Sequence, residues 1–237
     1  MKKLLAALMT LALLLSCCAL ACAEEITPAA YASYAVTAPV IDGEIDEIWN
    51  NSERIWTYGK YEEGKNMAYG YVKILWDEGH LYFLAVVTDP TLANLRDINP
   101  ANGVNFWVSE TNCKEGDFQN PGDWHYFSNQ AGRFYYYTGN TAVEEKGICA
   151  AKIAEDGAQY IVELQMPVLT EGLTLEEGHF IGFEVSIDDD MIGNNKRDVY
   201  VNWKGEGSYW SDVGALQNVL LTKDVTEHPD VPFEPAK

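Results

Sequence analysis

Residues 69–87 read YGYVKILWDEGHLYFLAVV, and this stretch carries the clearest secondary-structure signal in the chain. Its first half alternates between two sets of side chains, and its last seven residues form a continuous apolar run, so both halves have the pattern of a β-strand. Between them, Asp77-Glu78-Gly79 supplies residues that favour a tight turn. The stretch therefore predicts a β-hairpin with strands over 69–76 and 81–87.

Short segments of the same kind continue toward the C-terminus, separated by loops rich in Gly, Asn, Pro and Asp. We expect strands over 104–108, 124–128, 133–138, 150–154, 160–166, 180–187, 199–203 and 216–221. Pro167 ends one of them, because proline cannot donate to a strand ladder. No long segment has helical periodicity, and only a single turn is expected at 46–50. The pattern predicts an all-β protein, an antiparallel β-sandwich of about ten strands in one domain.

Both ends of the chain are expected to lie outside this sandwich. Lys2 and Lys3, an apolar run and Ala21-Cys22-Ala23 have the layout of an export signal. Ser16-Cys17 within the same run leaves open a lipid anchor at Cys17. We therefore expect a secreted protein, or one that is lipid-anchored at the cell surface. The expected divisions are a signal peptide (1–23), an N-terminal leading segment (24–37), the sandwich (38–223) and a Pro-rich tail (224–237).

The net charge excludes one large class of partners. The chain has 36 acidic and 16 basic residues, a net charge of −20, and removing the signal with its two lysines makes this −22. So acidic a protein repels phosphate backbones and anionic membrane surfaces. We expect no nucleic-acid partner, no membrane span in the exported protein, and a monomer.

Catalytic motifs are missing from the sequence. It contains no Gly-x-Ser-x-Gly, no Gly-rich phosphate loop and no His-Glu-x-x-His. Glu110, Glu163 and Glu184 lie in expected strands and could flank a glycosidic bond, but they also fit a solvated sheet face. We expect no catalytic residue, with a small glycosidase as the alternative.

The sequence leaves open whether the protein binds calcium and whether its two remaining cysteines form a disulfide. Asp188-Asp189-Asp190 at a strand end concentrates the hard oxygen ligands that calcium prefers, although adjacent strand residues point to opposite faces. The four histidines have no ligand spacing, so zinc and copper are not expected. Cys113 and Cys149 alone lie beyond the export signal, and an oxidising compartment favours a disulfide between them. Two separate buried thiols are the alternative.

Trp210 is the clearest candidate for ligand binding. It stands in the segment KGEGSYWSD, residues 204–212, where glycine and serine offer an indole little apolar surface to pack against. A sugar ring has apolar C–H faces that pack on flat aromatic rings. We predict that Trp210 is a stacking platform, the alternative being an indole folded back over the sandwich edge. Trp49, Trp76 and Trp203 are expected in the core instead, and Trp107 and Trp124 fall between these cases.

The ordered series of segments resembles the family 9 carbohydrate-binding modules. The segments that carry the resemblance are APVIDGEIDEIW (38–49), VKILWD (72–77) with LYF (81–83), VTDP (87–90), GVNFWV (103–108), YIVE (160–163) with Met166-Pro167, IGFEV (181–185), and Arg197, Trp203 and Trp210 before Leu216. Together they cover residues 38–222. The resemblance implies a noncatalytic jelly-roll sandwich that grips sugars or chain ends of plant polysaccharide such as xylan or cellulose. It further implies a xylanase-like partner domain, no required cofactor and, commonly, a structural calcium.

Position by position, the resemblance implies a sugar site made of five residues. Trp210 corresponds to the second of two clamping tryptophans, and Asn99 stands near the first. Asn105 takes the place of a glutamate, His125 of an arginine and Ser186 of a glutamine. We predict Trp210 as the stacking surface with Asn105 and His125 as hydroxyl partners. These substitutions also favour an alternative, a cell-surface structural or protein-interaction module that has lost sugar binding.

Overall fold

The computed structural model describes residues 26–224 except 60, 61, 63, 64, 93–101, 133, 136–140, 156, 195 and 206. The chain folds into a β-sandwich, as predicted. Its elements in the described residues are β1 (Ala30–Tyr34), the 3-10 helix η1 (Glu47–Asn51), β2 (Ile55–Thr57), β3 (Tyr69–Trp76), β4 (His80–Thr88), β5 (Gly103–Ser109), β6 (Asp123–Ser128), β7 (Phe134–Tyr135), α2 (Thr141–Lys146), β8 (Ile148–Ile153), β9 (Gln159–Pro167), β10 (Phe180–Asp189), β11 (Val199–Asn202), the 3-10 turn η3 (Val213–Ala215) and β12 (Gln217–Thr222).

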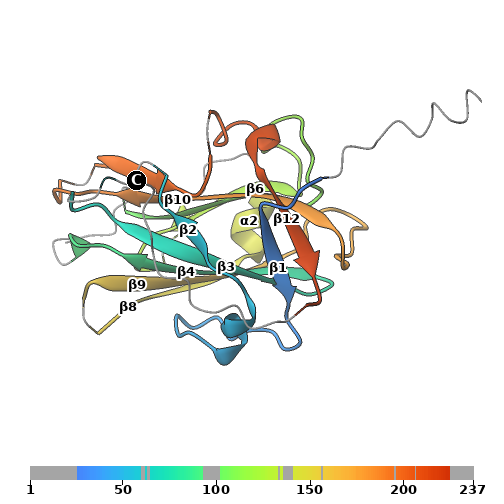
Figure 1. The fold of residues 1–237 in the computed structure, drawn as a ribbon, viewed down its shortest axis with the longest axis horizontal. Coiled ribbons are helices and arrows are strands. Elements are labelled where there is room, and N and C mark those ends of the chain that lie inside the picture. Colours follow the sequence, from blue (N-terminus) through green and yellow to red (C-terminus); the bar gives the residue numbers. More distant parts are fainter. Residues whose placement is uncertain are drawn as a thin grey trace, which may run out of the picture.

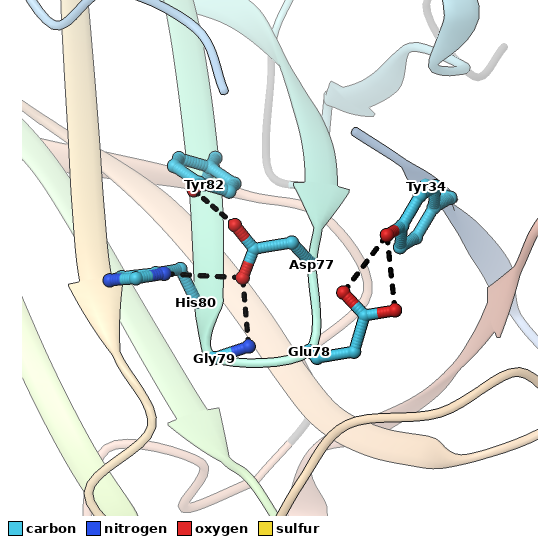
Figure 2. Close-up of polar contacts among 6 residues, drawn as sticks. All are labelled: Tyr34, Asp77, Glu78, Gly79, His80 and Tyr82. Carbon is cyan, nitrogen blue, oxygen red and sulfur yellow. Dashed lines mark hydrogen bonds and ion pairs between the residues drawn. The ribbon is translucent and has the colours of Figure 1, made fainter. Parts of the chain in front are cut away.

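The predicted hairpin is confirmed as β3 and β4, in which Trp76 pairs with Leu81. Figure 2 shows how Asp77 organises the turn between them. Its Oδ1 accepts a hydrogen bond from the Gly79 amide at 2.8 Å and lies 3.1 Å from His80 Nδ1. Its Oδ2 accepts a hydrogen bond from the Tyr82 hydroxyl at 2.6 Å. An aspartate that bonds its own turn and the returning strand fixes the register of the hairpin.

β1 was not predicted, because it lies within the leading segment 24–37. It runs parallel to both of its neighbours, β12 and β3, whereas the other strand pairs of the described structure are antiparallel. The long connection between β1 and β3 imposes no hairpin, so it allows a parallel pairing. At the end of β1 the Tyr34 hydroxyl donates to both oxygens of Glu78, at 2.9 and 3.0 Å, as Figure 2 also shows.

The strands form two layers that are joined at one edge. The order of hydrogen-bonded neighbours is β7-β6-β5-β10-β12-β1-β3-β4-β9-β8, with β11 on β10 and β2 on β3. Figure 1 shows β3, β4, β9 and β8 side by side, with β10 and β6 above them in this view. Between the layers the Phe83 ring contacts Phe106, Trp124 and Phe183 at centroid distances of 5.5, 5.9 and 5.5 Å. Apolar burial between the two layers holds the sandwich together.

A second, smaller cluster covers the outer face of β3 and β4. Trp49 on η1 is fully buried there against Leu75, Tyr82 and Leu84. Its indole N–H donates to Glu163 at 3.0 Å, which anchors the segment around η1 to the sheet. Trp49, Trp76 and Trp203 are buried as expected, although Trp49 lies outside the space between the layers.

The predicted disulfide is absent from the structure, in which Cys113 and Cys149 are free thiols. Cys113 lies in the loop after β5, where its thiol contacts the Glu115 carbonyl oxygen at 3.1 Å. Cys149 lies on β8, where its thiol contacts the Ser128 hydroxyl at 3.4 Å. Because each thiol is held by a different part of the sandwich, the two are separate, as in the alternative, although both cysteines are half-buried and not fully buried.

The expected signal peptide, the lipid anchor at Cys17 and most of the Pro-rich tail lie outside the described residues. None of the helices in the described part of the chain is long and apolar enough to cross a membrane.

Candidate functional site

The candidate site lies on the face of β5, β6, β10 and β11 that points away from the core. Asn105 pairs with Ser186, and Trp107 pairs with both His125 and Glu184. Directly paired residues of an antiparallel ladder share one face, so the pairing places these five side chains together. The alternate residues of the same strands, such as Phe106 and Val185, belong to the core.

A cavity of about 180 Å³ opens on this face. It is lined by Trp107, Ser186, Arg197, Tyr200, Tyr209 and Trp210. Sites for drug-sized ligands typically enclose about 300–1,000 Å³, so this cavity suits one small ring. Four aromatic side chains, two of them tyrosines with hydroxyl groups, together with one serine hydroxyl and one guanidinium group are the mixture expected for a ligand with apolar faces and polar edges.

The aromatic side chains that line the cavity differ in burial, because Trp107 and Tyr209 are buried whereas Trp210 is largely exposed. Tyr209 packs edge-on against Trp107 with ring centroids 5.0 Å apart, and both are buried in a cluster with Phe118 and Leu216. Trp210 packs edge-on against Tyr209 at 5.3 Å, yet 53% of Trp210 is exposed. The indole is therefore supported from below while much of its surface stays open to solvent.

Glu184 anchors the segment that carries Tyr209 and Trp210. Its Oε1 accepts hydrogen bonds from the Trp203 amide at 3.0 Å and the Lys204 amide at 3.3 Å. Burial raises the pKa of the Glu184 carboxyl to about 7, although the amide hydrogen bonds act in the opposite direction. Asn202 adds a hydrogen bond from its side-chain amide to the Gly205 carbonyl oxygen at 2.7 Å.

Asn105 and His125 lie beneath the cavity and do not line it. The His125 ring stacks on Trp107 at 4.5 Å with an interplanar angle of 9°. Its Nε2 lies 2.8 Å from Asn105 Oδ1, and the Asn105 amide donates to Ser186 Oγ at 3.4 Å. Burial lowers the pKa of His125 to about 3, so the imidazole is neutral at pH 7 and its Nε2–H donates to Asn105. These two residues support the cavity from below.

Of the five predicted site residues, the structure therefore places Trp210 and Ser186 at the cavity, and Asn105 and His125 under it. Asn99 lies outside the described residues. Sequence reasoning did not select Arg197, Tyr200 or Tyr209 as lining residues. Tyr209 could have been noticed as the neighbour of Trp210 in the same loop. Arg197 was named only as part of the resemblance, and the position of β11 beside β10 is what identifies Tyr200 and the segment before it as part of the cavity.

The three glutamates considered for glycosidase chemistry do not face a shared cleft. Each is fully buried and not solvated as we expected. Glu110 accepts hydrogen bonds from the amides of Leu169 and Thr170, as Glu163 does from Gly43 and Glu184 from Trp203. Each glutamate ties a loop to the sheet, because a buried carboxylate needs several N–H donors to be stable.

The three consecutive aspartates diverge, as strand geometry requires. Asp188 contacts Arg197 on the cavity face, whereas Asp189 accepts a hydrogen bond from the Ala68 amide at 2.6 Å. Asp190 accepts one from the Asn194 amide at 3.0 Å. Across the described residues no group of three His, Cys, Asp or Glu side chains has a metal-binding arrangement. One atom remains of interest, Asp189 Oδ1, which is buried without a hydrogen-bond partner.

Residues 41–223 match the model of the carbohydrate family 9 binding domain-like family. The chain belongs to this family. Among curated proteins it is similar to exoglucanase XynX of Acetivibrio thermocellus, with 33% identity over 82% of this chain. It is also similar to endo-1,4-beta-xylanase A of Thermoanaerobacterium saccharolyticum, with 34% identity over 78% of this chain. The chain spans only 17% and 15% of these two relatives.

Solved structures of family 9 modules share the fold. One from Caldicellulosiruptor kristjanssonii in complex with cellotriose has a TM-score of 0.69 and 25% identity, covering 87% of this chain and 99% of that one. The glucose complex from the same organism has a TM-score of 0.67 and 25% identity, covering 81% and 94%. The predicted family and fold are confirmed, and the class is that of a noncatalytic carbohydrate-binding module.

Proposed function

We propose that the cavity beside Trp210 binds the terminal sugar of a plant polysaccharide chain and leaves it chemically unchanged. The observation that carries this proposal is the indole of Trp210, which is 53% exposed at the rim of a cavity of about 180 Å³. An exposed tryptophan beside a small hollow offers a pyranose a flat apolar surface and an enclosed end.

The chemistry of the lining supports a sugar over a purely apolar ligand. The C–H face of a pyranose would lie on Trp210, whose flat ring supplies a large apolar surface for it. Its hydroxyls would meet the Ser186 hydroxyl and the Arg197 guanidinium, both of which line the same hollow. The small volume favours a single terminal residue over the middle of an extended chain.

The relatives indicate which sugars to try first. The two solved modules are complexes with glucose and cellotriose, and the curated relatives are named as an exoglucanase and a xylanase. We therefore propose glucose- or xylose-terminated chains as ligands. We also propose that the module is exported and works beside an enzyme that degrades such chains.

Isothermal titration with glucose, cellotriose and xylotriose tests the proposal. We expect at least one of them to bind, and Trp210→Ala to weaken binding tenfold or more. The control is Tyr31→Ala, which removes another exposed aromatic ring, 41% accessible, from β1 and outside the cavity lining. If the wild type binds none of these sugars, the alternative of an interaction module without a sugar site is favoured.

The proposed binding needs no cofactor, because the lining residues supply aromatic, hydroxyl and guanidinium groups only. A structural calcium ion remains a separate proposal. Asp189 Oδ1 is the atom that best fits it, because it is buried and lacks a hydrogen-bond partner. Asp89 and Asp190 act on its charge but do not form a metal-binding group of three with it, so backbone carbonyl oxygens and water would have to complete the coordination.

A further inference from the structure

A second hollow, of about 430 Å³, opens between the segment after β5 and the segment before β10. Its lining includes Ile26, Thr111, Asn112, Glu177, His179 and Phe180. It shares no lining residue with the cavity beside Trp210. We call it the Phe180 hollow, and it is a separate feature of the surface.

Both hollows lie on the outer face of β10. Phe180 and Ser186 are an even number of positions apart on a strand with unbroken register, so their side chains point to the same side. At roughly 3.3 Å per residue, they are about 20 Å apart along the strand. Between them, Leu216 lies over Gly182 and packs in the buried cluster with Trp107. The middle of this face is therefore closed, and a ligand can reach only its two ends.

Phe180 is an apolar ring that the core does not use. Cross-strand pairing places it beside Leu220 on the outer face. Neither residue belongs to a buried apolar cluster of the described chain. Ile26, which lines the same hollow, is 49% exposed. The hollow therefore has an apolar floor with a flat ring, the kind of surface on which the C–H face of a sugar packs.

Asn112 supplies an oriented polar group in the same hollow. Its backbone has a φ of 50°, in the left-handed region that asparagine tolerates better than most residues. Its side-chain amide donates to Asn218 Oδ1 at 3.1 Å. The Oδ1 atom of Asn112 is buried and has no hydrogen-bond partner. Because an unpaired buried acceptor is unfavourable, a hydroxyl donor on a ligand would stabilise this arrangement.

The other polar groups of the hollow are mostly acceptors as well. His179 is held from behind, because its Nε2–H donates to the Glu110 carbonyl oxygen at 2.6 Å. Glu176 and Glu177 are exposed and add two carboxylates, and Thr111 adds a hydroxyl. Sugar hydroxyls can donate to all of these groups. A ring, an amide oxygen and several hydroxyl acceptors together suit a polyhydroxylated ligand.

We propose that the Phe180 hollow is a second contact point for the polysaccharide, on the same outer face as the Trp210 cavity and about 20 Å from it along β10. This inference rests on the function proposed above, from which it takes the class of ligand. A trisaccharide is too short to occupy both hollows, whereas the surface of a polymer reaches both. Two contacts on one molecule raise the affinity for the polymer above that for a short sugar.

The test compares short and polymeric ligands. Isothermal titration with cellotriose and xylotriose reports on the Trp210 cavity, and depletion isotherms on insoluble cellulose and insoluble xylan report on both contacts. Phe180→Ala and Asn112→Gly should each leave the trisaccharide affinity within about twofold, as expected for residues away from that cavity. Each should lower the affinity for the polymer by roughly tenfold or more, because the gain from linking two contacts is lost.

The variants are chosen so that folding does not decide the result. Asn112→Gly removes the side chain at a φ that glycine adopts without strain, so it serves if thermal unfolding shows that Phe180→Ala does not fold. Phe180→Tyr keeps a flat ring and should keep the polymer affinity. Ile153→Ala is the control, because it removes a 46% exposed apolar side chain from β8 that lines neither hollow. It should bind both kinds of ligand within about twofold of the wild type.

The outcomes separate this inference from the proposed function. If Trp210→Ala weakens trisaccharide binding but Phe180→Ala and Asn112→Gly bind the polymer as Ile153→Ala does, the proposed function stands and the second contact is overturned. If these two variants weaken trisaccharide and polymer binding equally, the second contact is overturned as well. If the wild type binds polymer but no trisaccharide, and only these two variants weaken it, the Trp210 cavity fails and the second contact stands. A wild type that binds neither ligand overturns both.

Discussion

Replacing Glu184 by Gln should change how the stability of the protein depends on pH. Burial raises the pKa of this carboxyl from 4.5 to about 7 in the folded state. Between about pH 4.5 and pH 7, the Glu184 carboxyl is therefore protonated in the folded protein but ionised in the unfolded chain. Wild-type stability should fall across this window and level off above it. The glutamine side chain of the variant cannot titrate, so the contribution of this position to the slope disappears.

The magnitude follows from the size of the shift. A change of about 2.5 pKa units, at 1.36 kcal/mol per unit, corresponds to about 3 kcal/mol between pH 4 and pH 8. The unfolding free energy of Glu184→Gln minus that of the wild type should therefore rise by about 3 kcal/mol between pH 4 and pH 8. Its absolute stability at one pH is a different quantity, because the glutamine amide cannot accept the hydrogen bonds from Trp203 and Lys204 as well as a carboxylate does.

Urea unfolding at pH 4, 5, 6, 7 and 8 measures the effect, with Glu171→Gln as the control. Glu171 is an exposed residue of the loop after β9, so its replacement should leave the difference from wild type constant within about 0.5 kcal/mol. If the wild type and Glu184→Gln have parallel stability profiles between pH 4 and pH 8, Glu184 is not the buried acid that the structure describes.

Three further outcomes are expected. Phe83→Ala should lower the free energy of unfolding, measured in urea, by about 3–5 kcal/mol, because the Phe83 ring contacts three aromatic rings of the opposite layer. A decrease of less than about 1 kcal/mol would contradict that packing. Reducing agent should leave the thermal midpoint of the mature chain unchanged, since both cysteines are free thiols, and a drop of several degrees would show a disulfide. Millimolar calcium should raise the thermal midpoint of unfolding more at pH 8 than at pH 5. The reason is that burial raises the pKa of Asp189 to about 7, and only the ionised carboxylate binds the cation. The Asp189→Asn variant should not show this increase.

Much of the sandwich was predictable because its strands have strong local patterns. The hairpin of β3 and β4 and the strand ended by Pro167 appear where alternation, turn residues and proline chemistry place them. β1 was missed, because Ala30–Tyr34 contains no Val, Ile or Phe to mark it as a strand and becomes one only between β12 and β3. Its β structure depends on neighbours that are far away in the sequence.

The site was predictable only in part, for a related reason. Trp210 was selected because a tryptophan in a polar loop has no local surface to bury. Asn105 and His125 were selected by resemblance, and the structure places them one level below the cavity. Tyr200 was passed over, and Arg197 was named only as part of the family resemblance and not as a site residue, since nothing near them in the sequence indicates that β11 lies beside β10.

The chain by itself therefore determined the strands, their apolar faces and the exposed indole, because each depends on residues within a few positions of one another. Only the tertiary structure decided which polar side chain reaches a ligand. That choice depends on cross-strand register, which pairs Asp188 with Tyr200 and Ser186 with Asn105 across long separations in the sequence. It depends equally on burial, which turns Glu110, Glu163 and Glu184 from apparent surface acids into loop anchors.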